Sequence, residues 1–162
     1  YRSTGKGNKV KGWELETQGS IGEQWNISAG FARTRIRNAA GVLQRTTTPQ
    51  ETFRLNTSWR PGGIEGRFWL GGGVTWQSRI WNNSTKPTAD YLTTGRTESA
   101  RITQDAFYLL NLAGGYRFNE NFSAQLNISN LLDKKYYNNV GFYQGVYWGE
   151  PRNVSVTLRW KL

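Results

Sequence analysis

The last eleven residues alternate strictly between apolar and polar side chains, and this pattern limits what the chain can fold into. In residues 152–162, RNVSVTLRWKL, one parity carries Val154, Val156, Leu158, Trp160 and Leu162. The other parity carries Asn153, Ser155, Thr157, Arg159 and Lys161. A period of two is that of a β-strand with one apolar face. A tilted strand of about eleven residues is also long enough to cross a bilayer.

The composition excludes several classes of functional site. The chain has 162 residues and contains no cysteine, histidine or methionine. It therefore cannot supply a disulfide, a thiolate or imidazole metal site, or a Ser-His-Asp arrangement. We expect no enzyme and no cofactor. The sequence also lacks a run of eighteen apolar residues, which excludes a transmembrane helix but leaves a membrane barrel open, because barrel strands alternate.

The charge of the chain is strongly positive. Lys and Arg number 21 against 11 Asp and Glu, which gives a net charge of +10. In a soluble protein such an excess indicates an anionic partner, so a basic β-domain that binds nucleic acid or carbohydrate is one alternative. Eight Trp, eight Tyr, seven Phe and 19 Gly are typical of a β-rich chain with glycine at its turns.

Six further segments show the alternation of a strand. With the last segment, the predicted strands are 10–21, 25–37, 51–60, 64–81, 105–118, 122–130 and 152–162. The connections after the second, fourth and sixth strands are long, and the other three are short. Antiparallel membrane barrels have this asymmetry, with short periplasmic turns and long extracellular loops. The predicted fold is therefore all-β, an antiparallel transmembrane β-barrel segment of about seven strands.

Aromatic and cationic side chains support the same interpretation. The apolar-parity residues nearest the short turns are Trp25, Trp59, Tyr116, Phe118, Phe122 and Trp160. Such a ring suits the headgroup boundary of a membrane, although the core of a β-sandwich is an alternative. The opposite parities carry Arg54, Arg67, Arg117, Arg159 and Lys161, which suits a wet lumen. Arg33, Arg35 and Arg37 have the outward parity at the looped end, where they could meet anionic lipopolysaccharide or simply be solvated.

A run of glycines and an Asp-Lys-Lys sequence are both expected to have structural roles. The run Gly71–Gly73 is similar to a phosphate loop, but no Lys-Ser/Thr follows and the run lies within a strand. It is expected to form a β-bulge or to allow close approach of a neighbouring backbone. Asp133, with Lys134 and Lys135, is expected to order the start of the last loop.

Motifs in the second half of the chain resemble a known family. The segments NISNLLDKKYYNNVGFY (127–143) and YWGEPRNVSVTLRWKL (147–162) closely resemble the closing part of TonB-dependent ferric-siderophore receptors. The segment KGWELE (11–16) is similar to another strand of that family, so the resemblance spans nearly the whole chain. In one departure, the family usually ends in Phe, which the barrel assembly machinery reads, whereas this chain ends in Leu162. In another, the family's barrels have 22 strands around a plug domain, and here seven strands are predicted.

The resemblance implies that residues 1–162 are the C-terminal third of a receptor and begin inside an extracellular loop. The plug domain and the TonB-binding segment would then lie outside this chain. The implied protein is a multi-pass β-barrel of the bacterial outer membrane that imports a ferric siderophore and is energised through TonB. Membrane lipid, lipopolysaccharide and the barrel assembly machinery are implied partners, and nucleic acid is no longer needed to explain the charge. The alternative is a small passive outer-membrane pore or an adhesin barrel.

The resemblance also indicates where a ligand would bind. Because the siderophore already holds the iron as cargo, its receptor needs no metal ligand of its own. Recognition would depend on aromatic faces, hydrogen bonds and cationic side chains in the looped vestibule. The candidates are Gln77, Arg79 and Trp81, assigned to the lumen parity of the strand 64–81, and Tyr143, Tyr147 and Trp148 in the last loop. For each aromatic residue the alternative is loop packing or an outer girdle, and the sequence does not identify the siderophore.

Overall fold

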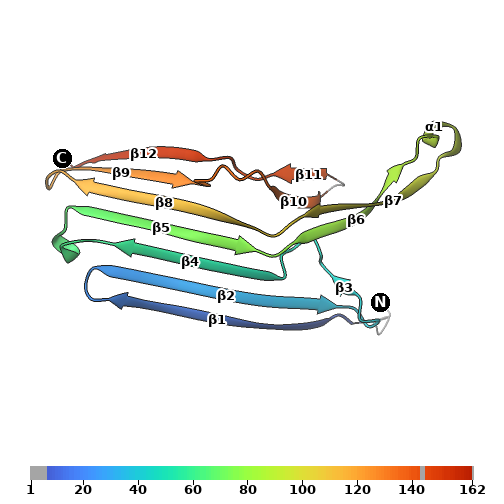
Figure 1. Cartoon of the computed structure of the whole chain (residues 1–162), viewed down its shortest axis with the longest axis horizontal. Helices are drawn as coiled ribbons and strands as arrows, with labels where there is room; N and C mark the ends of the chain where they lie inside the picture. The colour runs from blue at the N-terminus through green and yellow to red at the C-terminus, as the bar shows by residue number, and fades with distance from the viewer. Residues whose placement is uncertain (1–6, 143–144, 162) are drawn as a thin grey trace.

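A computed structural model of the chain describes residues 7–142 and 145–161, and its main sheet is curved and antiparallel (Figure 1). Its strands, in spatial order, are β1 (Lys9–Ile21), β2 (Trp25–Arg37), β4 (Glu51–Trp59), β5 (Phe68–Gln77), β8 (Phe107–Arg117), β9 (Phe122–Ser129) and β12 (Asn153–Trp160). Each strand pairs with the strands that precede and follow it in this order. The all-β fold and the seven predicted sheet strands are confirmed.

The register brings the apolar parity of all seven strands to one face, which we call the apolar face. Near the looped end a row of aromatic residues crosses four strands, because Phe53 pairs with both Phe31 and Trp76, and Trp76 pairs with Tyr108. The opposite face, called the polar face, carries mainly polar and small residues such as Asn56.

A second aromatic row lies at the short-turn end, as the sequence predicts. Trp25 pairs with Trp59 across β2 and β4. Successive ring centroids of Tyr116, Phe118, Phe122 and Trp160 are 5.0, 5.0 and 5.6 Å apart. On β8 the two rows are about eight residues, or roughly 27 Å, apart along the strand. With the usual tilt of barrel strands this corresponds to a height of about 20 Å, close to that of the apolar band of a membrane barrel.

The large side chains of the apolar face are not covered by a second layer. Leu15, Val156 and Trp160 are 67%, 65% and 64% exposed. Among the described residues, the only buried hydrophobic side chains are Ile80, Phe107 and Val140. An apolar surface of this extent requires a covering partner, and lipid provides one. Within residues 7–142 and 145–161, no helix is long and apolar enough to span a membrane.

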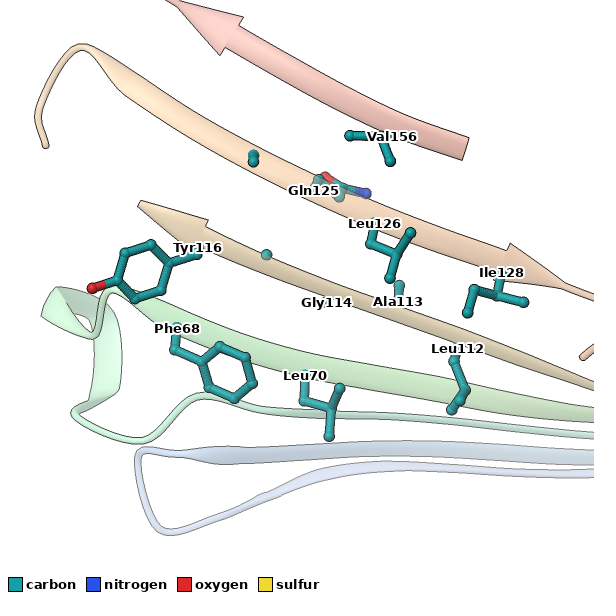
Figure 2. A pocket seen from close by; sticks show the side chains of 12 residues that line it. Phe68, Leu70, Leu112, Ala113, Gly114, Tyr116, Gln125, Leu126, Ile128 and Val156 are labelled. Carbon is teal, nitrogen blue, oxygen red and sulfur yellow. The ribbon is translucent and has the colours of Figure 1, made fainter. Parts of the chain in front are cut away.

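A shallow groove on the apolar face also suits contact with lipid (Figure 2). Its floor is low because Gly114 and Ala124 are small. Its volume is about 400 Å³, and the surrounding side chains are mostly apolar, among them Phe68, Leu70, Leu112, Leu126, Ile128 and Val156. The groove offers almost no polar surface that could orient a specific ligand.

The short and long connections lie at opposite ends of the sheet (Figure 1). The β1–β2 turn has Gly22 at φ 60°, and the β4–β5 turn contains the 3₁₀ helix η1 (Gly63–Glu65) preceded by Gly62 at φ 86°. In the β8–β9 turn, the side-chain oxygen of Asn119 accepts hydrogen bonds from the backbone N–H groups of Asn121 and Phe122, at 3.0 and 2.8 Å. The predicted asymmetry of the connections is confirmed.

The long connections are more ordered than the sequence predicts. The predicted strand 64–81 is wrong at both ends, because β5 starts at Phe68 and ends at Gln77. The connection that follows contains β6 (Ile80–Pro87), the one-turn helix α1 (Tyr91–Thr94) and β7 (Thr97–Gln104). The last connection contains a hairpin of β10 (Tyr137–Phe142) and β11 (Gly145–Trp148), and β3 (Leu43–Gln44) pairs with the end of β2.

Glycine in the middle of β5 allows close packing rather than a bulge. The register of β5 with β4 and β8 runs through Gly71–Gly73 without a shift, so the bulge interpretation is wrong. A Cβ atom added at Gly73 would lie 2.7 Å from Oδ1 of Asn56 and 3.0 Å from the carbonyl oxygen of Leu55. The alternative expectation, close approach by the neighbouring strand, is confirmed.

The sheet is open in this chain. Strands β1 and β12 form its two edges, and both run from the looped end to the short-turn end. Direct pairing of these two edges would be parallel. An antiparallel barrel that includes this sheet therefore requires an odd number of additional strands.

Candidate ligand-binding site at the looped end

Two hairpins pack against each other at the looped end. Strand β10 lies against β6 and β7 (Figure 1). Ile80 on β6 and Val140 on β10 are fully buried. The side-chain oxygen of Gln104 on β7 accepts a hydrogen bond from the backbone N–H of Tyr137 at 2.7 Å. Gly141 has φ 100°, and a Cβ atom there would collide with the side chain of Asn82, so the contact between the hairpins requires glycine.

Asn130 fixes the start of the last loop. Its side chain is buried, with a residue exposure of 4%, and its φ of 47° is in the left-handed region. Nδ2 donates to the carbonyl oxygens of Lys134 and Glu150, at 3.0 and 2.9 Å. Oδ1 accepts from the backbone N–H of Lys134 at 2.9 Å. One side chain therefore ties together the two ends of the last loop.

Asp133 adds a second tie between the same segments. Its carboxylate accepts a hydrogen bond from the backbone N–H of Arg152 at 2.9 Å. The guanidinium of Arg152 in turn donates to the carbonyl oxygen of Leu131 at 3.4 Å. The predicted ordering role of Asp133 at the start of the loop is confirmed. The NLLDKK and GEPRN motifs are thus the two halves of one hydrogen-bonded base.

The base holds a concave surface that we call the mouth pocket. It has a volume of about 600 Å³ and is lined by Tyr136, Asn138, Asn139, Tyr147, Trp148, Gly149 and Glu150. The ring of Tyr136 packs on Phe107, with ring centroids 4.5 Å apart, and covers Gly149. The ring of Trp148 packs on Tyr137 at 4.5 Å, while 64% of the residue is exposed. The pocket thus offers aromatic faces together with amide and phenol groups.

The mouth pocket suits an organic ligand better than a bare metal ion. Across the described part of the chain, no three His, Cys, Asp or Glu side chains form a group that could hold a metal. Flat aromatic faces and amides instead provide stacking and hydrogen bonds.

At the tip of the β6–β7 hairpin, the Thr88 hydroxyl donates to Asp90 at 2.6 Å and holds the pKa of that carboxyl below its usual value.

The structure separates the predicted site residues. Tyr147 and Trp148 lie together in the mouth pocket, and Tyr143 lies outside the described residues. Gln77 is the last residue of β5, on the polar face, and pairs with Thr52 and Phe107. The mouth pocket adds Tyr136, Asn138 and Asn139, which were not among the candidates although they follow the NLLDKK motif directly.

Arg79 and Trp81 do not share a face with Gln77, and the prediction of one alternating strand is wrong here. The ladder stops after the pair of Gln77 with Phe107 and resumes at the pair of Ile80 with Gln104, so residues 78 and 79 have no partner in this ladder. After this break the even residues of β6 and β7 face β10, as the contacts of Asn82 and Gln104 show. Trp81 has the opposite parity, so it faces away from the last loop.

Arg79 and Trp81 instead line a different concavity, which we call the outer pocket. It has a volume of about 320 Å³, and its other lining residues are Arg35, Arg37, Leu43, Gln50, Glu51 and Ser78. Arg35 and Glu51 continue the parity of the apolar face beyond its aromatic row near the looped end, and the backbone N–H of Ser78 donates to the carbonyl oxygen of Glu51. The guanidinium of Arg79 lies 5.5 Å from the ring centroid of Trp81.

Comparisons with known proteins agree with the strand pattern and the motifs. The family described as "TonB dependent receptor-like, beta-barrel" matches residues 1–131. The chain is 32% identical over 164 residues to the ferripyoverdine receptor of Pseudomonas aeruginosa, covering 99% of this chain and 19% of the relative. It is 36% identical over 154 residues to the ferric-pyoverdine 358 receptor of Pseudomonas putida, covering 95% of this chain and 17% of the relative.

Solved structures show the same fold. The pyoverdine outer membrane receptor FpvA from Pseudomonas aeruginosa PAO1, bound to pyoverdine, matches with a TM-score of 0.84 and 31% identity over 96% of this chain and 22% of that chain. The complex of FpvAI with pyocin S2 matches with a TM-score of 0.85 and 31% identity, covering 96% of this chain and 19% of that chain.

The chain spans about a fifth of the length of the curated relatives that it matches, less than the third predicted from the sequence. The family is one of transport receptors rather than of enzymes. The apolar face, the open edges and the looped end of this chain are those of a barrel wall in the outer membrane. The chain therefore belongs to the TonB-dependent receptor family, as a segment of its outer-membrane β-barrel.

Proposed function

We propose that the protein containing this chain is an outer-membrane receptor that binds and imports a ferric siderophore of the pyoverdine class, energised through TonB. The observation that carries this proposal is the 32% identity to a ferripyoverdine receptor over 99% of the chain. In this proposal the chain supplies part of the barrel wall and part of the extracellular mouth.

The mouth pocket is the part of the chain to which we assign siderophore contact. Trp148 and Tyr136 would stack on the planar organic groups of the chelate, and Asn138 and Asn139 would hydrogen-bond to its polar edge. Gln77 would contribute from the polar face below. Because the siderophore provides the oxygen ligands of the iron, the pocket needs shape and hydrogen bonds rather than metal-binding side chains.

Iron uptake by the full-length receptor tests this proposal. The receptor is produced in a host that lacks its own siderophore receptors, and the uptake of radioactive iron from ferric pyoverdine is measured with and without functional TonB. We expect saturable uptake that stops when TonB is absent. Uptake that does not saturate and continues without TonB would instead favour the passive pore, and planar-bilayer conductance in the absence of siderophore would show the open lumen that a pore requires.

The outer pocket provides a matched control. Arg79→Gln and Trp81→Phe alter two of the ligand residues that the sequence predicts. Both residues line the outer pocket and not the mouth pocket. We expect both variants to take up ferric pyoverdine at the rate of the unaltered receptor. A variant at Trp148 should take up less.

A further inference from the structure

The outer pocket lies just beyond the apolar face, at the looped end. In the aromatic row below it, Phe53 pairs with Phe31 and with Trp76. One step further along the same parity, Arg33 pairs with Glu51, and the backbone N–H of Ser78 donates to the carbonyl oxygen of Glu51 at 2.9 Å. The aromatic row marks the edge of the apolar band. The outer pocket is therefore at the level of the headgroups of the outer leaflet.

The lining of the outer pocket has a clear positive excess. It contains Arg35, Arg37 and Arg79 but a single carboxylate, that of Glu51. Glu51 is already shared, since its Oε1 lies 3.2 Å from Nε of Arg33 and 3.9 Å from a terminal nitrogen of Arg35. Among the described residues, Arg79 forms no ion pair with a carboxylate. The lining therefore has uncompensated positive charge, which an anion from outside the chain could neutralise.

The remaining lining residues shape the pocket. The hydroxyl oxygen of Ser78 accepts hydrogen bonds from the backbone N–H groups of Gln50 and Glu51, both at 3.1 Å. This fixes the hydroxyl at the break between β5 and β6. Trp81 lies beside it with Arg79 and Arg101 over its ring, at 5.5 and 6.0 Å from the centroid. Two guanidinium groups are thus held near one flat apolar surface.

We propose that the outer pocket binds a phosphate group of lipid A, the membrane anchor of lipopolysaccharide, in the outer leaflet. Guanidinium groups bind phosphate in bidentate geometry, and a fixed hydroxyl adds a further donor. The tryptophan ring provides contact for the sugar or the first methylenes of an acyl chain. A soluble anionic siderophore would approach the mouth pocket from the other side of the hairpins. The inference depends on the membrane position of the chain and not on its cargo.

The test is direct binding of lipid A to the full-length receptor. The receptor is purified in detergent, freed of lipopolysaccharide and titrated with bisphosphorylated lipid A and with dephosphorylated lipid A. We expect the Arg35→Gln/Arg79→Gln double variant to bind the bisphosphorylated form about 30-fold more weakly. This estimate takes the loss of each arginine near an anionic membrane surface to lower the affinity about fivefold. Dephosphorylated lipid A should bind weakly to both proteins.

A second double variant controls for the change in charge. Arg54→Gln/Arg159→Gln removes the same charge from the polar face. This control should keep the affinity for lipid A within about twofold. Heat-modifiable migration on gels checks that each variant still forms the barrel.

Three results of the lipid A titrations would overturn the proposal: unchanged affinity in the Arg35/Arg79 variant, equal binding of dephosphorylated lipid A, or an equal loss in the control variant. The affinity for ferric pyoverdine is measured on the same proteins and should not change. If it falls with the Arg35/Arg79 variant, the pocket belongs to the siderophore route and the lipid A assignment is wrong. Absence of pyoverdine binding in all proteins would contradict the proposed function while leaving the lipid A result interpretable.

Discussion

The side-chain amide of Asn130 donates to the carbonyl oxygen of Glu150 at 2.9 Å, and this bond joins segments that are 20 residues apart in the sequence. The same side chain also bonds both backbone groups of Lys134. The NLLDKK and GEPRN segments of this chain therefore have a structural role. They hold the base on which the mouth pocket is built.

Asn130→Ala should loosen the last loop without unfolding the barrel. The substitution leaves two carbonyl oxygens and one N–H without their buried partner, and each such loss costs on the order of 1–3 kcal/mol. We expect the backbone N–H of Lys134 to exchange with solvent at an opening free energy lower by about 2 kcal/mol. Hydrogen exchange on the full-length receptor measures this change.

Asn153→Ala is the matched control for Asn130. Asn153 is exposed on β12 and pairs with Ser129 near the same end of the sheet. Its substitution should change the exchange of the last loop by less than about 0.5 kcal/mol. Equal protection of Lys134 in wild type and Asn130→Ala would mean that other contacts hold the loop.

Leu126→Arg should destabilise the barrel much more than Gln125→Arg, although the two residues are neighbours. Leu126 lines the apolar groove near the middle of β9, where an arginine would face lipid (Figure 2). Arginine on the lipid face at the bilayer midplane costs about 2–4 kcal/mol. Gln125 has the parity of the polar face, so Gln125→Arg should cost less than about 1 kcal/mol. Denaturant unfolding from lipid vesicles compares the two, and equal destabilisation would contradict the assignment of the faces.

Ser78→Ala should loosen the connection between β2 and β4. The hydroxyl oxygen accepts hydrogen bonds from the backbone N–H groups of Gln50 and Glu51, both at 3.1 Å, and alanine removes this acceptor. We expect the opening free energy of these two N–H groups to fall by about 1 kcal/mol. Ser78→Thr keeps the hydroxyl and should restore most of the protection. Loss of protection with threonine as well would indicate a steric rather than a hydrogen-bonding role.

The membrane-spanning part of the fold was predictable because its two faces meet different surroundings. One face contacts lipid and the other an aqueous or protein interior, so the sequence alternates clearly from Phe53 to Trp59 and from Val154 to Trp160. Strands β6 and β7 were missed because most of their residues, such as Lys86 and Glu98, are polar on both faces. A hairpin that extends beyond the membrane has little contrast between its faces.

The error at Trp81 has a different physical cause. Alternation gives the face of a residue only while the ladder is continuous, and this ladder is interrupted at residues 78 and 79, after Gln77. A similar limit applies to β10 and β11, whose crowded aromatic residues follow no simple period because their register shifts twice. Hydrogen bonds such as that from Asn130 to Glu150 connect distant segments, and the pattern of one strand does not reveal them.

The affinity of the full-length receptor for ferric pyoverdine tests the central claim most directly, and quenching of intrinsic tryptophan fluorescence measures it. We expect saturable binding that Trp148→Ala weakens about tenfold or more, as for an exposed aromatic residue that stacks on a ligand. Trp13→Ala, on the apolar face against Phe31, should leave the affinity unchanged. Absence of saturable binding by the unaltered receptor, or equal affinity of the wild type and Trp148→Ala, would contradict the account of the mouth pocket.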